Sequence, residues 1–202
     1  ATVPLERQQM LTKFGAQIVL SNYVYGRRGV EQRAQEAVEQ TGGYFLNYFD
    51  NDLNAEFHRR VTGPNIAKAT GGALDAVVAG VGSGGTITGV GEYIKAWYPD
   101  VKAVAVEPYE SQAIGGGDIG RHNIPGLGAG FVPENYNPYI VDAVMDVPSH
   151  TANVTAREVL ETDAIPASPS AGAVLTAAHQ LMAEHPDLKR VVCVFAGQVL
   201  YE

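Results

Sequence analysis

The sequence predicts an α/β protein with a parallel sheet flanked by helices. Two observations carry this prediction. Short apolar runs rich in β-branched residues alternate along the chain with segments of helical spacing. Two of these runs, AVVAGV (76–81) and AVAVEP (103–108), lack the apolar–polar alternation of a half-exposed strand, so we expect them to be buried on both faces. Such alternation of buried strands and helices is typical of a parallel sheet.

The expected elements follow in chain order. Strands are expected at the apolar runs QIVL (17–20), YFLNYF (44–49), AVVAGV (76–81), AVAVEP (103–108), IVDAVMDV (140–147) and VVCVFA (191–196). Helices are expected where apolar residues recur with helical spacing, at about 4–14, 29–40, 53–69, 85–97, 151–163 and 171–184. The segment 85–97 contains several poor helix formers, so its prediction rests on the glycine turn before it. We expect residues 1–202 to form a single α/β lobe.

Composition and charge exclude several classes of function. An apolar fraction of 46% is sufficient for a core, and a formal net charge of −8 disfavours binding to nucleic acids. There is no run of about 18 apolar residues to span a membrane, and the first residues lack the order of a signal peptide. The lone cysteine, Cys193, lies in an apolar run and is expected to be a reduced core residue rather than a nucleophile. We therefore expect a cytoplasmic protein.

One long segment departs from the alternation of strands and helices. Residues 111–138 are rich in Gly, Pro and Asn and show no periodicity. Segments of this length inside a compact domain are usually functional, although a surface loop that merely connects two elements remains an alternative. Seven glycines in the segment indicate a backbone that passes close to a ligand or changes shape.

A glycine-rich turn follows the run at 76–81. Gly80, Gly82 and Gly85 satisfy the pattern G-x-G-x-x-G, and Glu107 closes the next expected strand about twenty residues later. This combination is typical of dinucleotide-binding domains, in which the acidic residue binds a ribose hydroxyl. A nicotinamide-dependent oxidoreductase is therefore one hypothesis, although the motif lies in the middle of the chain rather than near its start.

The same turn also fits a smaller anion. The sequence GSGGT, residues 82–86, places hydroxyl groups at Ser83 and Thr86 between small residues. Backbone N–H groups, hydroxyls and a helix N-terminus together suit a phosphate monoester. A third interpretation is a tight turn whose glycines serve packing alone.

Other catalytic patterns are weak. The five histidines are scattered without metal-ligand spacing, so no metal site is predicted. No G-x-S-x-G nucleophile motif occurs. His58 and His122 are the two histidines that lie in segments with recognisable motifs. A structural role is expected for both, and a position near a substrate cleft is the alternative.

Several motifs together carry a resemblance to a known family. The segments VAGVGSGGTITGVGEYIK, VKAVAVEP and HNIPGLGAGFVP resemble those of cysteine synthases (O-acetylserine sulfhydrylases), which are fold-type II pyridoxal-phosphate enzymes. PLERQQMLTKFGAQIVL and HRRVTGPNIAKATGGALDAVVAG continue the resemblance upstream, and TAREVLETDAIPASPSAGAV continues it downstream. The resemblance therefore spans nearly the whole chain and implies a fold like that of the tryptophan synthase β subunit.

The resemblance implies a cofactor site and a substrate cleft. It assigns the cofactor, pyridoxal 5′-phosphate, to Gly82, Ser83, Gly84, Gly85 and Thr86, and also to Ser170 in the sequence Ser-Ala-Gly-Ala. It assigns the cleft to Tyr48, which replaces a family glutamine, and to Gly126, Gly128 and Ala129. The implied reaction is β-replacement, in which sulfide displaces acetate from O-acetyl-L-serine to give L-cysteine. A homodimer acting on a small amino-acid substrate is also implied.

Two family features are absent from the sequence. The family's serine–x–x–lysine, whose lysine holds the cofactor, has no counterpart among the five lysines, so no catalytic residue is assigned. The family serine that binds the pyridine nitrogen corresponds to Gly197 when Tyr201 anchors the comparison, or to Ala196 after a shift of one residue. We therefore expect this chain to lack the lysine-bearing region and to be inactive alone. A non-catalytic relative that binds a phosphate compound or a partner protein is the alternative.

Overall fold

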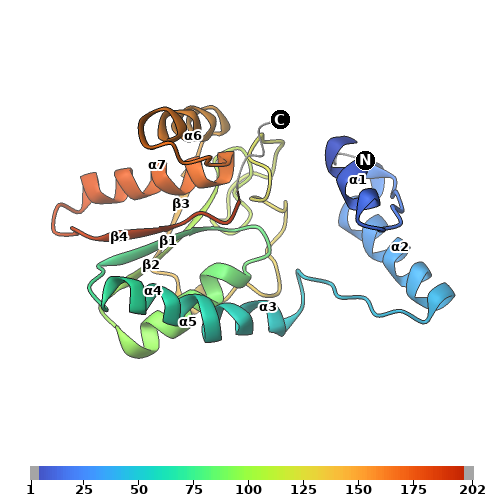
Figure 1. The fold of residues 1–202 in the computed structure, drawn as a ribbon, viewed down its shortest axis with the longest axis horizontal. Helices are drawn as coiled ribbons and strands as arrows, with labels where there is room; N and C mark the ends of the chain where they lie inside the picture. The colour runs from blue at the N-terminus through green and yellow to red at the C-terminus, as the bar shows by residue number, and fades with distance from the viewer. Residues whose placement is uncertain (1–4, 198–202) are drawn as a thin grey trace. The chain divides into compact units, whose positions relative to one another are not determined.

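The computed structural model describes residues 5–197 and contains two compact units, one ending at Asn47 and one beginning at Tyr48. Figure 1 labels their helices and strands. Each unit is described by itself. The single lobe expected for residues 1–202 therefore stays a prediction, and Tyr201 lies outside the described residues.

The first unit is helical. Helix α1 (Leu5–Lys13) and helix α2 (Gly26–Thr41) confirm two expected helices, and a short 3-10 turn, η1 (Tyr23–Tyr25), precedes α2. The strand expected at 17–20 is wrong. A strand needs a hydrogen-bonded neighbour, and within the described part of the chain no segment pairs with these residues. Gly29 is the one buried residue among the side chains described in this unit.

The second unit contains the sheet. Its helical elements are α3 (Asp52–Phe57), the π-helix η2 (His58–Thr62), α4 (Gly63–Thr70), α5 (Gly85–Trp97), the 3-10 turn η3 (Pro138–Ile140), α6 (Ser149–Asp163) and α7 (Pro169–Glu184). Its strands are β1 (Ala76–Gly80), β2 (Lys102–Pro108), β3 (Ala143–Val147) and β4 (Val191–Val194). The strand expected at 44–49 is wrong. The carbonyl of Tyr48 instead accepts hydrogen bonds from the side-chain amides of Asn54 and Asn135.

The sheet confirms the predicted fold class. Its strand order is β3-β2-β1-β4 and every neighbouring pair is parallel. In register, Ala76 of β1 faces Lys102 of β2 and Val191 of β4. All four strands therefore end at the same edge, where the glycine turn begins.

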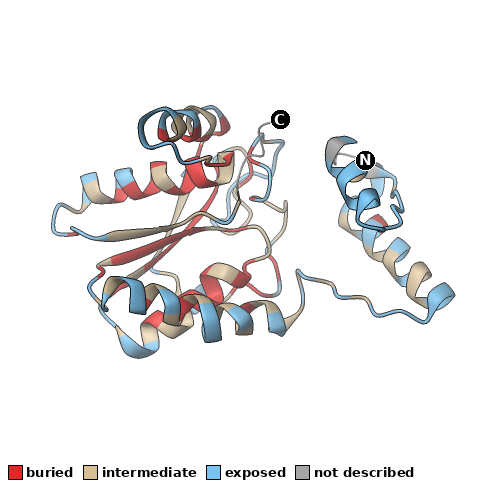
Figure 2. Cartoon of the chain, viewed as in Figure 1, coloured by how far each residue is buried: buried red, intermediate tan, exposed pale blue. Residues whose placement is uncertain are grey.

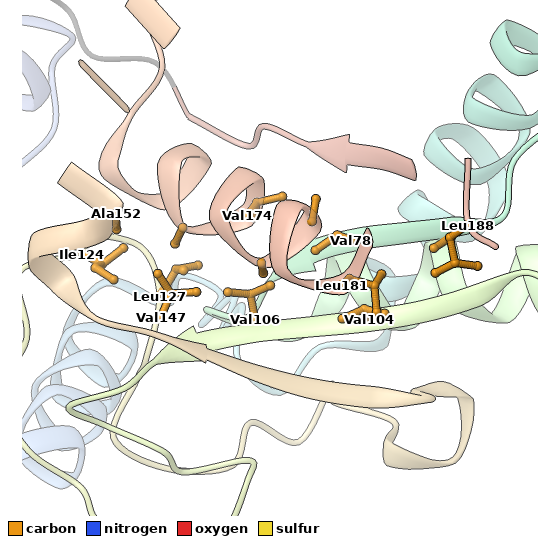
Figure 3. Close-up of a cluster of buried hydrophobic side chains, with 14 residues drawn as sticks. Val78, Val104, Val106, Ile124, Leu127, Val147, Ala152, Val174, Leu181 and Leu188 are labelled. Atoms are coloured by element: carbon orange, nitrogen blue, oxygen red, sulfur yellow. The ribbon is translucent and has the colours of Figure 1, made fainter. Parts of the chain in front are cut away.

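Alternate residues of the central strands face two different helical layers. Figure 1 shows α6 and α7 on one face of the sheet and α3, α4 and α5 on the other. Val78 and Val104 pack on the α7 side, whereas Val77 and Ala103 pack on the α5 side. Buried residues concentrate in β1, β2 and the facing sides of these helices (Figure 2). Figure 3 shows the α7-side core, including Val174 and Leu181 of the helix. This burial on both faces explains the uninterrupted apolar runs in the sequence.

One acidic side chain joins the strands at their amino-terminal edge. The carboxylate of Asp75, which precedes β1, accepts hydrogen bonds from the backbone N–H groups of Lys189 and Arg190, both at 2.7 Å. Its carbonyl accepts from the N–H group of Lys102 at 2.9 Å. The two N–H groups that bind the carboxylate lower the pKa of Asp75. Asp75 thus links the starts of β1, β2 and β4.

Candidate functional site

The glycine turn connects β1 to α5 at the carboxyl edge of the sheet. Gly84 precedes the helix in the left-handed region, with φ +83°, and no side chain caps the helix. The first N–H groups of a helix have no partner within the helix, and they carry its positive dipole end. The N-terminus of α7 lies at the same edge, because Ser168 at its cap adjoins Gly197, which follows β4. The carboxyl edge therefore offers backbone donors suited to an anion.

The glycines of the turn are required by packing. A Cβ atom at Gly82 would collide with the carbonyl of Gly126, and one at Gly85 would collide with the side chain of Asn54. A Cβ atom at Gly84 would lie 2.9 Å from the backbone nitrogen of Tyr136. The packing interpretation therefore accounts for these glycines, and the case for an anion rests on the N–H groups and hydroxyls.

Both hydroxyls of the turn are contacted from the segment formed by α3 and η2. The Nδ2 amide of Asn54 donates to Ser83 Oγ at 2.9 Å. The Nε2 atom of His58 lies 3.2 Å from Thr86 Oγ1, and its Nδ1 atom lies 2.8 Å from Thr62 Oγ1. Burial lowers the pKa of His58, which favours the neutral form of its ring. Sequence reasoning missed Asn54; for His58 it favoured a structural role and left a position near the cleft as the alternative.

A π-helical turn brings His58 to the glycine turn. The sequence predicts one helix over 53–69, but residues 58–62 form the π-helix η2 within it. Opposite η2, Gly89 of α5 allows close backbone approach, because a Cβ there would collide with the carbonyl of Ala55 and lie 2.7 Å from the nitrogen of Arg59. π-Turns are rare in helices and frequent at functional sites. In the sequence, only Gly89, one turn into α5, indicated that another backbone segment packs closely against this helix.

The expected cleft residues adjoin the turn. Gly126 contacts Gly82, and the N–H group of Gly128 donates to the carbonyl of Val81 at 3.0 Å. Ala129 follows and is partly buried. Tyr48 is connected to the turn by Asn54, which donates to its carbonyl at 2.8 Å as well as to Ser83. The structure thus places Gly126 and Gly128 against the turn and connects Tyr48 to it through Asn54, while the roles of all four residues stay predictions.

Ser170 lies at the N-terminus of α7. Its Oγ atom is 2.8 Å from Oγ of Ser168, which caps the helix by accepting from the N–H group of Ala171 at 3.3 Å. A Cβ atom at Gly197 would lie 3.3 Å from Ser168 Oγ and 3.9 Å from Ser170 Oγ. Two serine hydroxyls therefore adjoin the position at which the sequence lacks one.

Comparison with known proteins decides the family. The family model of pyridoxal-phosphate dependent enzymes matches residues 1–197. The chain belongs to this family. The predicted family, fold and cofactor class are thereby confirmed.

Cysteine synthases are among the proteins similar to this member of the pyridoxal-phosphate family. A cysteine synthase of Staphylococcus aureus is 38% identical over 194 residues, and cysteine synthase A of Escherichia coli K12 is 40% identical over 203 residues. Each match covers 96% of this chain and 63% of the relative, so the chain spans less than two thirds of their length. The crystal structure of a cysteine synthase from Entamoeba histolytica matches with a TM-score of 0.90 and 33% identity, over 98% of this chain and 59% of that one.

The glycine turn fits the phosphate of the family cofactor. The N-terminus of α5 has no side-chain cap, and Ser83 and Thr86 bring two hydroxyls to it. Asn54 donates to Ser83 Oγ, which leaves the Ser83 hydroxyl hydrogen for a second partner. No acidic side chain lies within residues 82–86 to repel an anion.

The carboxylate of Glu107 binds the backbone of the protein itself. It is 2% exposed, and its two carboxylate oxygens accept the backbone N–H groups of Ile114 at 2.9 Å and Gly115 at 2.7 Å. Burial raises the pKa of Glu107 above 4.5, while these two hydrogen bonds act in the opposite direction. The nicotinamide hypothesis needs Glu107 to bind a ribose hydroxyl. Both of its oxygens instead bind the loop that begins at residue 111.

The lysines of the second unit lie away from the turn. Lys102 begins β2 and Lys189 precedes β4, both at the amino-terminal edge. Lys95, in the last turn of α5, is 2.6 Å from the carboxylate of Asp142. Lys68 is exposed on α4. Within the described residues of this unit, no lysine lies at the carboxyl edge of the sheet.

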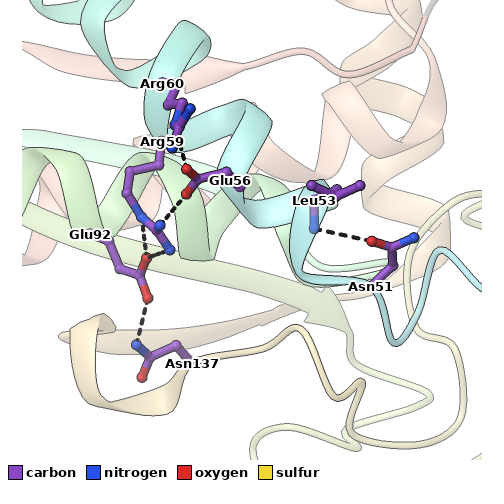
Figure 4. Close-up of polar contacts among 7 residues, drawn as sticks. All are labelled: Asn51, Leu53, Glu56, Arg59, Arg60, Glu92 and Asn137. Carbon is purple, nitrogen blue, oxygen red and sulfur yellow. Dashed lines mark hydrogen bonds and ion pairs between the residues drawn. The ribbon is translucent and has the colours of Figure 1, made fainter.

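A separate pocket of about 440 Å³ lies between α3, α5 and residues 134–137. Arg59 forms ion pairs with Glu56 and Glu92 beside it, and Asn137 donates to Glu92 at 2.9 Å (Figure 4). The hydrogen bond with Glu92 raises the pKa of Arg59. Asn51 starts α3 by accepting from the N–H group of Leu53. The ion pair between Arg59 of η2 and Glu92 of α5 holds these two elements together.

The remaining candidates are structural. Cys193 packs against the α7-side core, and burial raises its pKa to about 11, which agrees with the predicted core residue. Among residues 5–197 no group of three histidine, cysteine, aspartate or glutamate side chains could hold a metal. None of the helices in that range is long and apolar enough to cross a membrane.

Proposed function

We propose that this chain binds the phosphate group of pyridoxal phosphate at residues 82–86, as part of a cysteine synthase. The observation that carries the proposal is the N-terminus of α5, which has no side-chain cap and lies beside the hydroxyls of Ser83 and Thr86. Asn54 contacts the first of these hydroxyls and His58 contacts the second. Membership of the pyridoxal-phosphate family and identity of 38–40% to cysteine synthases support the same function.

The proposed reaction of the whole protein is replacement of the acetoxy group of O-acetyl-L-serine by sulfide, which gives L-cysteine and acetate. Bound pyridoxal phosphate supplies the electron-withdrawing group that this chemistry needs. Ser83, Thr86 and the N–H groups of α5 bind the phosphate and so fix the position of the ring. Ser170, next to Ser168 and Gly197, lies at the same edge and would also hold the cofactor there.

The segment 126–129 is proposed to form the wall of the substrate cleft. It is attached to the turn because Gly128 donates to Val81 and Gly126 contacts Gly82. Tyr48, held by Asn54 and Asn135, forms the opposite side. These residues orient the amino-acid substrate and exclude water from it.

The test of this function is a binding measurement. Inorganic phosphate and pyridoxal phosphate are titrated into the chain by calorimetry, and each is used to displace the other. Thr86→Val and Ser83→Ala are expected to weaken both ligands about tenfold each, because a hydrogen bond to a charged group contributes about 1.5–3 kcal/mol. Thr70→Val is the matched control, since Thr70 bonds its own helix at the carbonyl of Ile66. Equal affinity in wild type and Thr86→Val would contradict the proposal.

A second candidate is a non-catalytic relative that binds a phosphate compound or a partner protein. The observation that favours it is the position of the lysines of the second unit, which lie away from the carboxyl edge. Borohydride reduction in the presence of pyridoxal phosphate, followed by intact-mass measurement, separates the two. A covalent adduct on a lysine, together with release of cysteine from O-acetyl-L-serine and sulfide, excludes the second candidate.

We also propose that the protein is cytoplasmic and forms a homodimer. The single free cysteine and its packing in the core agree with a reducing compartment. Light scattering after gel filtration tests the dimer: a mass of about twice 21.5 kDa is expected, and a monomer would contradict it.

A further inference from the structure

We propose that Asn54 and His58 are positioning residues, which orient the hydroxyl groups of Ser83 and Thr86 so that both donate to a bound phosphate. The inference rests on the proposed phosphate site and assigns the two side chains that prepare it. Asn54 and His58 are four residues apart across the junction of α3 and η2, so they face α5 from the same side.

Asn54 fixes the direction of the Ser83 hydroxyl. Its Nδ2 group has two hydrogens, and the structure gives both an acceptor: the carbonyl of Tyr48 at 2.8 Å and Ser83 Oγ at 2.9 Å. Because Ser83 Oγ accepts from Asn54, its own hydrogen points elsewhere. The collision expected for any Cβ atom at Gly85 shows how closely Asn54 packs against the turn.

His58 has the same effect on Thr86, provided that its ring carries the proton on Nε2. In that tautomer Nε2 donates to Thr86 Oγ1, Thr62 donates to Nδ1, and the Thr86 hydrogen remains available to the phosphate. In the other tautomer Nε2 accepts the Thr86 hydrogen, which is then lost to the phosphate. The proposed role therefore requires the Nε2–H tautomer and makes Thr62 the residue that selects it.

The π-turn provides the geometry for this contact. His58 and Thr62 are the first and last residues of η2, and their side chains meet at 2.8 Å. Gly89 lets the backbone of this turn lie directly against α5, three residues after Thr86. A side chain at position 89 would push the His58 ring away from Thr86.

A double-mutant cycle measures whether His58 acts through Thr86. Affinity for inorganic phosphate and for pyridoxal phosphate is measured by calorimetry in wild type, His58→Leu, Thr86→Val and the double variant. We expect His58→Leu to weaken both ligands about tenfold in wild type and to have no effect in the Thr86→Val background. His58→Gln, which keeps a donor near the Nε2 position, is expected to restore most of the loss. His179→Leu is the control, because His179 is exposed on α7. Additive losses, or no rescue by glutamine, would overturn the proposal.

The equivalent cycle tests Asn54 and Ser83. Asn54→Ala is expected to weaken phosphate about tenfold in wild type and not at all in a Ser83→Ala background. Circular dichroism and unfolding curves on each variant separate loss of orientation from loss of folding. An equal effect of Asn54→Ala in both backgrounds would show that Asn54 does not act through Ser83.

The tautomer of His58 provides a test that needs no ligand. Long-range ¹H–¹⁵N correlation spectra identify which ring nitrogen carries the proton, and we expect Nε2–H in wild type and its loss as the single form in Thr62→Val. The Nδ1–H tautomer in wild type would overturn the proposal whatever binds. If wild type binds neither phosphate nor pyridoxal phosphate, the proposed function fails. The tautomer then decides the orientation of Thr86 on its own.

Discussion

At the scale of single residues, Glu107 shows how the protein accommodates a buried carboxylate at the carboxyl edge of the sheet. Its carboxylate is removed from water at the end of β2, and each oxygen binds one backbone N–H group of the following loop. Removal of a charge from water disfavours the ionised form, and Asp146 adds repulsion. The result is a raised pKa, so the stability that Glu107 contributes depends on pH.

We predict the sign of this dependence. A folded-state pKa above the ordinary value of 4.5 means that the native protein binds more protons than the unfolded chain between the two pKa values. The contribution of Glu107 to stability is therefore complete below pH 4.5 and falls as pH rises through the raised pKa. The difference in unfolding free energy between wild type and Glu107→Gln, measured by urea denaturation, should favour wild type less at pH 7 than at pH 4. A difference that grows with pH would contradict the assignment.

The sequence predicts which residues form the turn but not what orients them. GSGGT after an apolar run predicts a phosphate-type turn, and the structure places it at the carboxyl edge of the sheet. The contacts of Asn54 with Ser83 and of His58 with Thr86 join residues 28 or 29 positions apart in the chain. They depend on how α3 packs on α5, which local patterns do not specify.

At the scale of elements, helix α5 depends on glycines for two different reasons. Gly89 faces backbone atoms of α3 and η2, including the carbonyl of Ala55 and the nitrogen of Arg59. A Cβ atom at Gly91 would instead lie 2.5 Å from Cδ1 of Ile140, the tip of a flexible side chain, and 3.6 Å from Cβ of Ala103. Backbone atoms cannot yield without moving a helix, whereas an isoleucine tip can change its position.

This difference predicts that two alanine substitutions in one helix change the free energy of unfolding by different amounts. Gly89→Ala should destabilise the protein by about 1–3 kcal/mol, because the new methyl group overpacks the contact with η2. Gly91→Ala should change stability by less than about 1 kcal/mol, since the helix propensity gained offsets the shift of Ile140. Thermal and urea unfolding of the two variants compare them directly. Equal destabilisation would show that the approach of η2 to α5 is not the constraint.

The elements also show why sequence patterns succeed in one unit and fail in the other. AVVAGV and AVAVEP form β1 and β2 as predicted, because two helical layers bury both faces of these strands. QIVL at 17–20 has the same type of composition, but among the described residues no strand pairs with it. Its β-propensity alone therefore does not produce a strand. The sequence predicts an ordinary helix at residues 58–62, whereas the structure has a π-helix there, packed closely against α5 at Gly89.

At the scale of the whole chain, burial is distributed unevenly between the two units. The three hydrophobic clusters found among the described residues all belong to the second unit. Helices α2 and α7 have the same length of 16 residues, yet α2 buries Gly29 alone whereas α7 buries eight residues. Most of the stability of a helix in a protein comes from packing of this kind.

We therefore predict a large difference in amide hydrogen exchange between these two helices. Amides of α7 should exchange through global unfolding, and amides of α2 should exchange at least about a hundredfold faster through local opening. Mass spectrometry of peptic fragments after exchange in deuterated buffer measures both helices in one sample. Similar protection of α2 and α7 would show that contacts beyond those within the first unit stabilise α2.

The hydrogen bonds from Lys189 and Arg190 to the carboxylate of Asp75 fix the position of β4 along β1. Because the carboxylate of Asp75 sets where β4 begins relative to β1, the strand alignment is decided at the edge opposite the glycine turn. A slip of one position would carry Gly197 about 3.3 Å along the strand direction, away from Ser168 and Ser170. Because these hydrogen bonds lie at the amino-terminal edge, the loops at the carboxyl edge take no part in them. We therefore expect substitutions in those loops to leave the strand alignment unchanged.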